Sequence, residues 1–136
     1  MSVVLVDTGP LVALLDRSDP QHDQCREVFA GLRDTPATVW PVFTEAMYLL
    51  NFSWAAQAAL WEWLDTPALD ILPLTKDDGP RMKELMRKYQ DLPMDFADAA
   101  LVRVAEREKI RRVFTLDQRD FRLYRPLRLG RFSLVP

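Results

Sequence analysis

Four acidic side chains stand where a chain of alternating strands and helices can bring them together. Each follows a predicted strand or lies near the start of a predicted helix, beside apolar neighbours; they are Asp7, Glu45, Asp98 and Asp117. Converging carboxylates repel one another unless protons or cations neutralise them. Mg²⁺ or Mn²⁺ binds such oxygens together with substrate phosphate. A metal held this way can activate a water and stabilise the departing oxygen of a phosphodiester.

The same acids also have purely structural interpretations. Asp7 can cap the helix that follows it, and Glu45 can face solvent. Asp95 is a natural N-cap, with Asp98 three residues later in the place of a capping-box partner. The four acids together favour a metal site more than any one of them does.

Histidine chemistry is a poor alternative. His22 is the single histidine, so a mechanism that needs two histidines is excluded. A Ser–His pair is also disfavoured, because His22 lies in a polar segment that follows Pro20.

The elements that must position the acids alternate along the chain. Apolar runs predict strands at about residues 3–6, 38–40, 69–72, 112–116 and 132–135. Caps and apolar spacing predict helices at about residues 10–15, 21–32, 41–50, 54–65 and 76–86, and one that starts at 95. Asp117 and Asp120 can then be turn residues. Alternation of this kind indicates an α/β fold with a largely parallel sheet, whose sites form beyond the carboxyl ends of the strands.

Composition is that of one globular domain spanning residues 1–136. Hydrophobic residues make up 49% of the chain and charged residues 28%. Cys25 is the single cysteine, which fits a reducing compartment. No apolar run approaches the roughly 18 residues of a membrane span, and the opening apolar run lacks the basic flank of a secretory signal. We therefore expect a cytoplasmic protein without membrane contact.

Charge is distributed unevenly. Residues 98–136 carry 10 Lys and Arg against 5 Asp and Glu, although the whole chain has a net charge of −2. A basic segment beside an acidic remainder hints at a polyanionic partner. Arg119 and Arg122 are candidates to contact phosphates, and Phe121 or Tyr124 to stack on a base.

Four segments in a fixed order carry a resemblance to a known family. They are residues 4–11 (VLVDTGPL), 44–45 (TE), 95–102 (DFADAALV) and 115–121 (TLDQRDF). In this order they resemble the PIN-domain nucleases, and among them the VapC-like toxins of toxin–antitoxin pairs.

That resemblance implies a three-layer α/β/α sandwich with a mainly parallel central sheet. It implies Mg²⁺- or Mn²⁺-dependent cleavage of single-stranded RNA, in tRNA, rRNA or mRNA, by an endoribonuclease. The catalytic, metal-binding acids would be Asp7, Glu45, Asp98 and Asp117.

Further residues receive weaker assignments from the resemblance. Asp95 and Asp120 match less uniform acidic positions and would be supporting or alternative ligands. The hydroxyls of Thr8 and Thr115 would orient ligands or phosphate.

The resemblance also implies two protein partners, a second copy of the chain and a small antitoxin. A tryptophan-rich helix offers a surface for either one. Trp54 and Trp61 fall on one side of it, and Trp63 lies nearly opposite Trp61. The three cannot all face one core, and exposed aromatics often mark interfaces.

Two other functions remain open from the sequence: a stand-alone PIN nuclease that processes RNA, and a non-catalytic RNA- or protein-binding module of the same fold. Two other classes rank low. A phosphatase of the haloacid-dehalogenase type needs a second acid where Gly9 stands, and a dinucleotide-binding domain needs a glycine-rich turn after the first strand.

Overall fold

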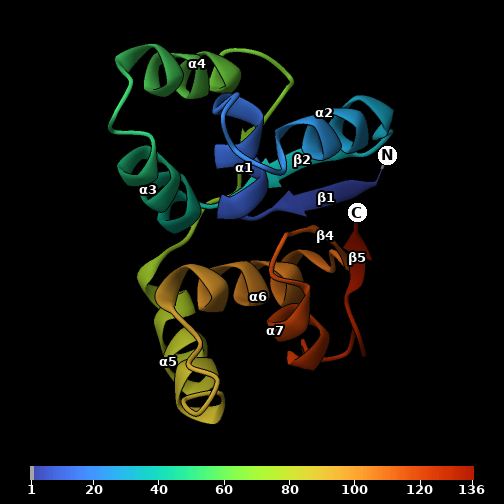
Figure 1. The fold of residues 1–136 in the computed structure, drawn as a ribbon. Coiled ribbons are helices and arrows are strands. Elements are labelled where there is room, and N and C mark those ends of the chain that lie inside the picture. Colours follow the sequence, from blue (N-terminus) through green and yellow to red (C-terminus); the bar gives the residue numbers. More distant parts are fainter. Residues whose placement is uncertain (1) are drawn as a thin grey trace.

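One parallel sheet organises the molecule (Figure 1). The computed structural model describes residues 2–136. Its strands are β1 (Val3–Val6), β2 (Thr35–Thr38), β3 (Asp70–Ile71), β4 (Arg112–Phe114) and β5 (Ser133–Val135). They lie in the order β3-β2-β1-β4-β5, and every neighbouring pair runs parallel. The predicted α/β class is confirmed.

Helices cover both faces of the sheet and make the three predicted layers. They are α1 (Thr8–Leu15), α2 (His22–Gly31), α3 (Trp40–Leu49), α4 (Trp54–Leu64), α5 (Gly79–Lys88), α6 (Phe96–Glu108) and α7 (Gln118–Leu123), with a short 3₁₀ turn η1 (Lys76–Asp78) before α5. In Figure 1, α1, α2 and α4 lie above the strands, and α5 and α6 lie below them. Within residues 2–136, no helix combines the length and the apolar character needed to cross a bilayer.

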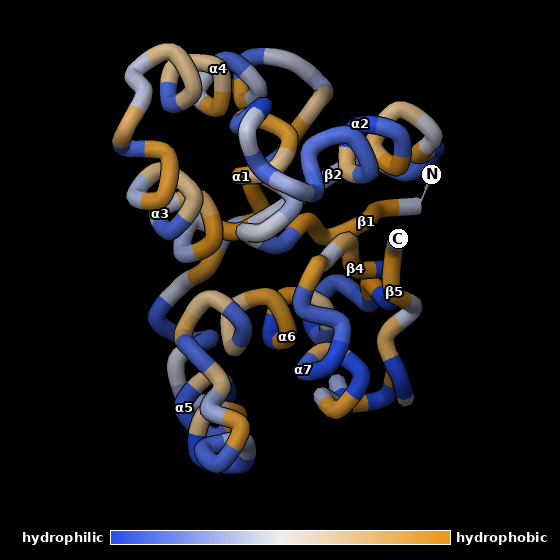
Figure 2. The backbone as a smooth tube through the Cα atoms, viewed as in Figure 1, coloured by the Kyte–Doolittle hydropathy of each residue, from blue (hydrophilic) through white to orange (hydrophobic). Residues whose placement is uncertain are grey.

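The central strand is apolar because both of its faces are covered. Val4, Leu5 and Val6 are completely buried, which suits a continuous apolar run in a parallel sheet. Figure 2 shows hydrophobic residues concentrated on β1, β4, β5 and the middle of α6, and hydrophilic residues on α2, α5 and α7. The buried strand ends at Val6, and Asp7, the residue after it, lies at the edge of the sheet.

An ion-pair cluster holds α5 and η1 against α6. The carboxylate of Asp78 is buried and pairs with Arg103 at 2.8 Å and Arg107 at 2.9 Å. Asp78 also accepts the backbone N–H of Thr75, which completes a capping box at η1. Burial opposes the charge, but these donors outweigh it and hold the pKa of Asp78 below its usual value. Helix α6, whose first turn carries Asp98, is thereby fixed in place.

Several elements differ from the sequence prediction. Helix α1 begins at Thr8, directly after Asp7, and the second strand is Thr35–Thr38 rather than residues 38–40. Val39 and Trp40 have strand propensity, but Pro41 suits the first turn of a helix and α3 takes Trp40 as its first residue. Helix α7 was not predicted, because six residues are too few for a helical pattern.

Candidate metal centre

Parallel register places the first acid. Val6 pairs with Phe114, so Asp7 and Thr115 emerge side by side at the carboxyl ends of β1 and β4. The Asp7 backbone N–H donates to the Phe114 carbonyl at 2.9 Å. The Thr115 hydroxyl donates to Asp7 Oδ2 at 2.8 Å, and its oxygen, Thr115 Oγ1, accepts the Asp117 backbone N–H at 2.9 Å. Thr115 therefore links two of the predicted acids. The Asp7 side chain does not cap α1, so the capping interpretation is wrong.

The start of α6 supplies the next acids. Asp95 is the N-cap, and its Oδ1 accepts the Asp98 backbone N–H at 2.8 Å. The capping interpretation is thus right for Asp95, whose carboxylate also lines the cavity described below. Asp98 lies in the first turn and is half-buried, and its Oδ2 accepts a hydrogen bond from the Tyr124 hydroxyl at 2.8 Å.

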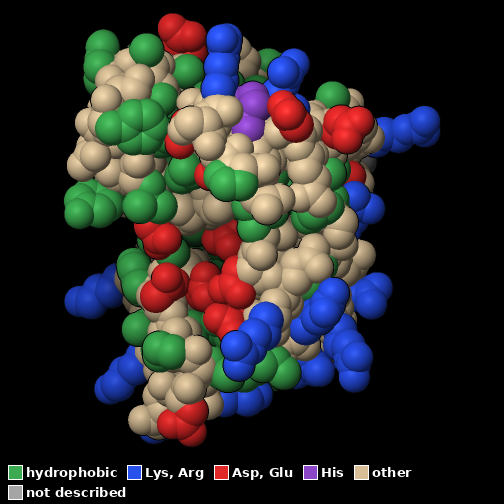
Figure 3. Space-filling model, in the orientation of Figure 1, with side chains coloured by type: hydrophobic (Ala, Val, Ile, Leu, Met, Phe, Trp, Pro, Cys, Tyr) green, Lys and Arg blue, Asp and Glu red, His purple; other side chains and the backbone are tan. Residues whose placement is uncertain are grey.

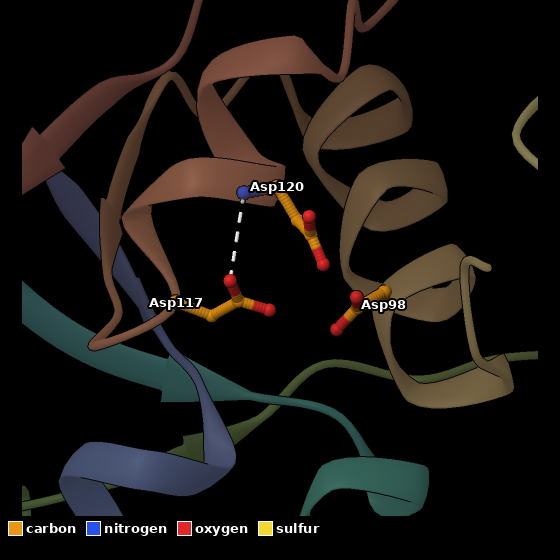
Figure 4. A group of neighbouring side chains, drawn as sticks. All are labelled: Asp98, Asp117 and Asp120. Atoms are coloured by element: carbon orange, nitrogen blue, oxygen red, sulfur yellow. Dashed lines mark hydrogen bonds between the residues drawn. The ribbon is translucent and has the colours of Figure 1, made fainter. Parts of the chain in front are cut away.

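Helix α7 brings a third group of acids. Asp117 is its N-cap and accepts from the Asp120 backbone N–H at 3.5 Å, so these residues belong to a helix start rather than to a simple turn. One carboxylate oxygen from each of Asp98, Asp117 and Asp120 lies within 4.8 Å of the others. Figure 4 shows the three side chains pointing toward one another from α6 and α7. Residues separated by about twenty positions in sequence thus form one cluster.

A cavity of about 550 Å³ opens at this edge of the sheet. Acidic side chains from five parts of the chain line it, namely Asp7, Asp19, Glu45, Asp95, Asp98 and Asp117. Asp120 adjoins it through Asp98 and Asp117. Figure 3 shows acidic side chains gathered in a hollow at the middle of one face. The structure therefore brings all six predicted acids to one place.

One acid of the cavity was not predicted. Asp19 follows α1, and the sequence analysis passed over it because Asp19-Pro20 looks like a simple break between helices. Its Oδ1 accepts the Gln21 N–H at 2.8 Å, as in an ordinary turn. No local sequence pattern distinguishes Asp19 from other aspartates in turns. Its loop lies beside the acidic cavity because of the tertiary fold.

Burial and mutual repulsion raise the pKa values of four of these acids. Burial is the main cause that raises the pKa of Asp7 to about 6, against the Thr115 hydrogen bond, with Glu45 and Asp95 adding repulsion. Burial, followed by repulsion from Asp7, raises the pKa of Asp98 to about 8. Burial also raises the pKa values of Glu45 and Asp117, which Asp95 and Asp120 respectively raise further. The cavity therefore favours any cation that can replace the protons.

The donor set fits a hard divalent cation. Carboxylate and hydroxyl oxygens are the ligands that Mg²⁺ and Mn²⁺ prefer. The Thr8 hydroxyl lines the cavity, is buried and finds no hydrogen-bond partner within residues 2–136. A buried hydroxyl without a partner is costly, and a metal-bound water or a phosphate oxygen at the cavity would satisfy it.

The predicted substrate-binding residues separate into two groups. Arg119 and Arg122 are exposed on α7, and Arg119 lines a shallow depression beside Thr115. Phe121 and Tyr124, predicted to stack on a base, are completely buried. That prediction is wrong, because their rings pack against each other in the core with centroids 5.1 Å apart.

The tryptophan-rich helix is α4. Trp54 and Trp61 are 71% and 47% exposed, whereas Trp63 stacks on Phe29 of α2 with centroids 5.8 Å apart. The predicted separation of Trp61 from Trp63 is confirmed.

Comparison with known proteins agrees with this fold. Residues 4–125 match the PIN domain family. Over 135 residues the chain is 30% identical to Ribonuclease VapC26 of Mycobacterium tuberculosis (strain ATCC 25618 / H37Rv), which covers 98% of this chain and all of the relative. The chain therefore belongs to the PIN-domain family.

Solved structures share the fold at lower identity. The sarcin–ricin loop cleaving toxin VapC20 of Mycobacterium tuberculosis superposes with a TM-score of 0.74 at 21% identity, over 82% of this chain and 87% of that one. A toxin–antitoxin complex from Klebsiella pneumoniae gives 0.67 at 18% identity, over 87% and 89%. VapBC2 from Rickettsia felis, bound to a DNA fragment from its promoter, gives 0.69 at 16% identity, over 98% and 99%.

The raised pKa values predict how metal-free stability depends on pH. The folded pKa values of Asp7 and Asp98, about 6 and about 8, lie above the ordinary 3.8, so the folded protein binds more protons than the unfolded chain. This contribution is complete below about pH 4 and is lost as pH rises through 6 and 8. In chelator, we expect the melting temperature to fall by several degrees, roughly 5 °C, between pH 5 and pH 9.

Thermal scans of two variants give the control. Asp98→Asn removes one titrating group and should flatten the profile, whereas Asp65→Asn, at an exposed position outside the cavity, should keep the wild-type slope. If the melting temperature of the metal-free protein rose steadily from pH 5 to pH 9, the raised pKa values of Asp7 and Asp98 would be contradicted.

Proposed function

We propose that this chain is a metal-dependent endoribonuclease that cleaves single-stranded RNA, and that it is the toxin of a VapBC-type toxin–antitoxin pair. One observation carries the proposal: carboxylates from β1, α3, α6 and α7 line one cavity at the carboxyl edge of the sheet. Membership of the PIN-domain family and full-length similarity to a protein named a ribonuclease support it.

The acids would act as ligands of Mg²⁺ or Mn²⁺. Asp7, Glu45, Asp98 and Asp117 are the proposed catalytic set, with Asp95 and Asp120 as supporting ligands. When bound, the metal would supply an activated water and stabilise the oxygen that departs from the phosphodiester.

The chain's own groups prepare the site for this chemistry. Thr115 holds Asp7 and the start of α7 together, and Asp95 holds the first turn of α6. Asp98, whose pKa is raised to about 8, must lose its proton when it binds a metal, so affinity should increase with pH up to about 8. The Thr8 hydroxyl, which lines the cavity without a hydrogen-bond partner within residues 2–136, would orient a water or a phosphate oxygen.

Cleavage of a mixed single-stranded RNA pool tests the proposal. The purified protein, free of any bound antitoxin, should cut the pool with Mg²⁺ or Mn²⁺ and not with chelator. Asp98→Asn should reduce the cleavage rate by at least roughly 100-fold. Loss of a residue that only supports a metal ligand can already cost that much, and Asp98 is proposed to be a ligand itself. Asp65→Asn, prepared identically, should retain wild-type activity because Asp65 is exposed and outside the cavity.

The outcomes separate the competing functions. Equal cleavage by wild type and Asp98→Asn would mean a contaminating nuclease or a wrongly assigned acid. RNA binding without cleavage in any metal would favour a binding module of the same fold.

We further propose that α7 guides the RNA backbone toward the acids. Arg119 and Arg122 are exposed on the helix whose N-terminus carries Asp117. Figure 3 shows basic side chains beside and below the acidic hollow, so attraction for phosphate lies next to the site that would cut it. Such contacts would position RNA without reading its sequence.

The salt dependence of RNA binding tests this role. Replacing both arginines with alanine should weaken binding and reduce the slope of log affinity against log salt by about 1.4, since each phosphate contact to a single strand contributes about 0.7. Lys83→Ala with Arg87→Ala removes the same charge from exposed positions on α5 and should leave the slope nearer the wild-type value. An unchanged slope in the Arg119 and Arg122 variant would contradict the proposal.

We propose that the exposed apolar surface of α3 and α4 binds the antitoxin. Five large side chains there are between 47% and 71% exposed, namely Tyr48, Leu49, Phe52, Trp54 and Trp61. Leu49 also lines the acidic cavity, so a partner on this surface would reach the site. Two of the similar structures are toxin–antitoxin assemblies, which supports a partner of that kind.

Co-expression with the small protein encoded by a neighbouring reading frame tests this surface. The partner should co-purify and suppress RNA cleavage. The double variant Phe52→Ser, Trp54→Ser should still cleave RNA when the partner is present. It loses hydrophobic contacts with the partner, whereas the acidic cavity is unchanged. Leu123→Ser with Leu127→Ser, at apolar positions 46% and 57% exposed elsewhere, should remain suppressed. We also propose that the chain forms a homodimer, as the family resemblance implies. A light-scattering mass of one chain at micromolar concentration would contradict this proposal.

A further inference from the structure

A buried phenol contacts the acidic cluster from the protein interior. Tyr124 follows α7, its side chain is completely buried, and its hydroxyl donates to Asp98 Oδ2 at 2.8 Å. Within residues 2–136 this is the only hydrogen bond that the Asp98 carboxylate accepts from a side chain, and Oδ1 accepts none. In Asp98, a predicted metal ligand, Oδ2 is therefore occupied by a hydrogen bond and Oδ1, within the part of the chain described, is free to accept another contact.

The Tyr124 ring is held rigidly. It packs edge-on against Phe121 with centroids 5.1 Å apart and against Tyr89 with centroids 5.0 Å apart. The Tyr89 hydroxyl is engaged elsewhere, because it accepts the Arg125 backbone N–H at 2.9 Å. Two phenols in ring contact thus have separate tasks: one fixes the chain after α7, and the other reaches an acid.

The Tyr124–Asp98 bond also spans the cluster. Asp117 begins α7 and Asp98 lies in the first turn of α6, while Tyr124 joins the end of α7 to Asp98. The hydrogen bond therefore helps to fix how Asp98 faces Asp117 and Asp120, whose oxygens lie within 4.8 Å of it.

We propose that Tyr124 is a positioning residue of the metal centre, whose hydroxyl holds Asp98 Oδ2 so that Oδ1 is presented to the cation. This inference rests on the proposed metal-dependent function and extends it to a residue outside the acidic set. Groups that hydrogen-bond to a metal ligand fix its orientation and tune its affinity.

The chemistry of the two groups agrees with the geometry. An unperturbed phenol titrates at about pH 10, so the Tyr124 hydroxyl carries its proton at neutral pH and can donate it to a hydrogen bond with the Asp98 carboxylate.

Direct Mn²⁺ binding tests the inference without relying on cleavage. Calorimetric titration of the metal-free protein compares wild type with Tyr124→Phe, which keeps the ring and removes only the hydroxyl. We expect Tyr124→Phe to weaken Mn²⁺ binding by about 10- to 100-fold, the usual cost of losing such a partner. Tyr89→Phe is the matched control: it removes a buried hydroxyl from the touching ring but not from an acid, and should bind Mn²⁺ as wild type does.

The outcomes distinguish this inference from the proposed function. If wild type binds Mn²⁺ and cleaves RNA while Tyr124→Phe binds Mn²⁺ equally well, Tyr124 has no positioning role and the nuclease proposal stands. If wild type neither binds Mn²⁺ nor cleaves RNA, the proposed function fails and this inference fails with it. Equal weakening in Tyr124→Phe and Tyr89→Phe would mean a general packing effect and would overturn the specific role.

A crystal structure of the wild-type protein with Mn²⁺ decides the matter if Tyr124→Phe fails to fold. The Tyr124 hydroxyl should remain bonded to Asp98 Oδ2 with the metal on Oδ1. A metal that contacts both oxygens, or a Tyr124 hydroxyl released from Asp98, would overturn the inference.

Discussion

Repulsion among buried carboxylates is the constraint on which this molecule depends. Burial is the largest cost to the charges of Asp7 and Asp98, and neighbouring carboxylates add to it: Asp7 repels the charge of Asp98, and Glu45 and Asp95 repel that of Asp7. A fold can keep such a cluster only if rigid elements hold the acids in place despite their repulsion. Here five of the six predicted acids lie at the ends or in the first turns of elements, and Glu45 lies in the second turn of α3. These elements pack into the core, so the local cost is met by packing elsewhere.

Anchoring follows a common scheme at each acid. Thr115 ties Asp7 to the start of α7, Asp95 caps the turn that carries Asp98, and the Asp78 cluster clamps α6 against α5. Gly9 belongs to the same scheme, because a Cβ at that position would approach Leu116 to 3.3 Å, closer than most side chains pack. The contacts leave the acids little freedom to move apart, which makes a cation the simplest means of relieving the repulsion.

The surroundings of the cavity differ from side to side. Exposed arginines on α7 adjoin it at one side, and exposed aromatic and aliphatic residues on α3 and α4 lie toward another. A polyanion and an apolar protein segment would therefore approach the acids over different surfaces. In the proposed toxin, this separation lets one partner be cut and another be bound, with the acidic cavity as the place where the two compete.

Local patterns in the sequence predicted the α/β class, most elements and the six acids. Those predictions depend on local signals: apolar runs for buried strands, caps and prolines for helix starts, and aspartates beside apolar segments. Tertiary structure alone decided that Asp19 joins the cavity, that Phe121 and Tyr124 are buried rather than free to stack on RNA, and that Tyr124 contacts Asp98. These facts depend on which distant residues meet. Strand register and helix packing set such meetings, and the spacing of residue types along the chain does not encode them locally.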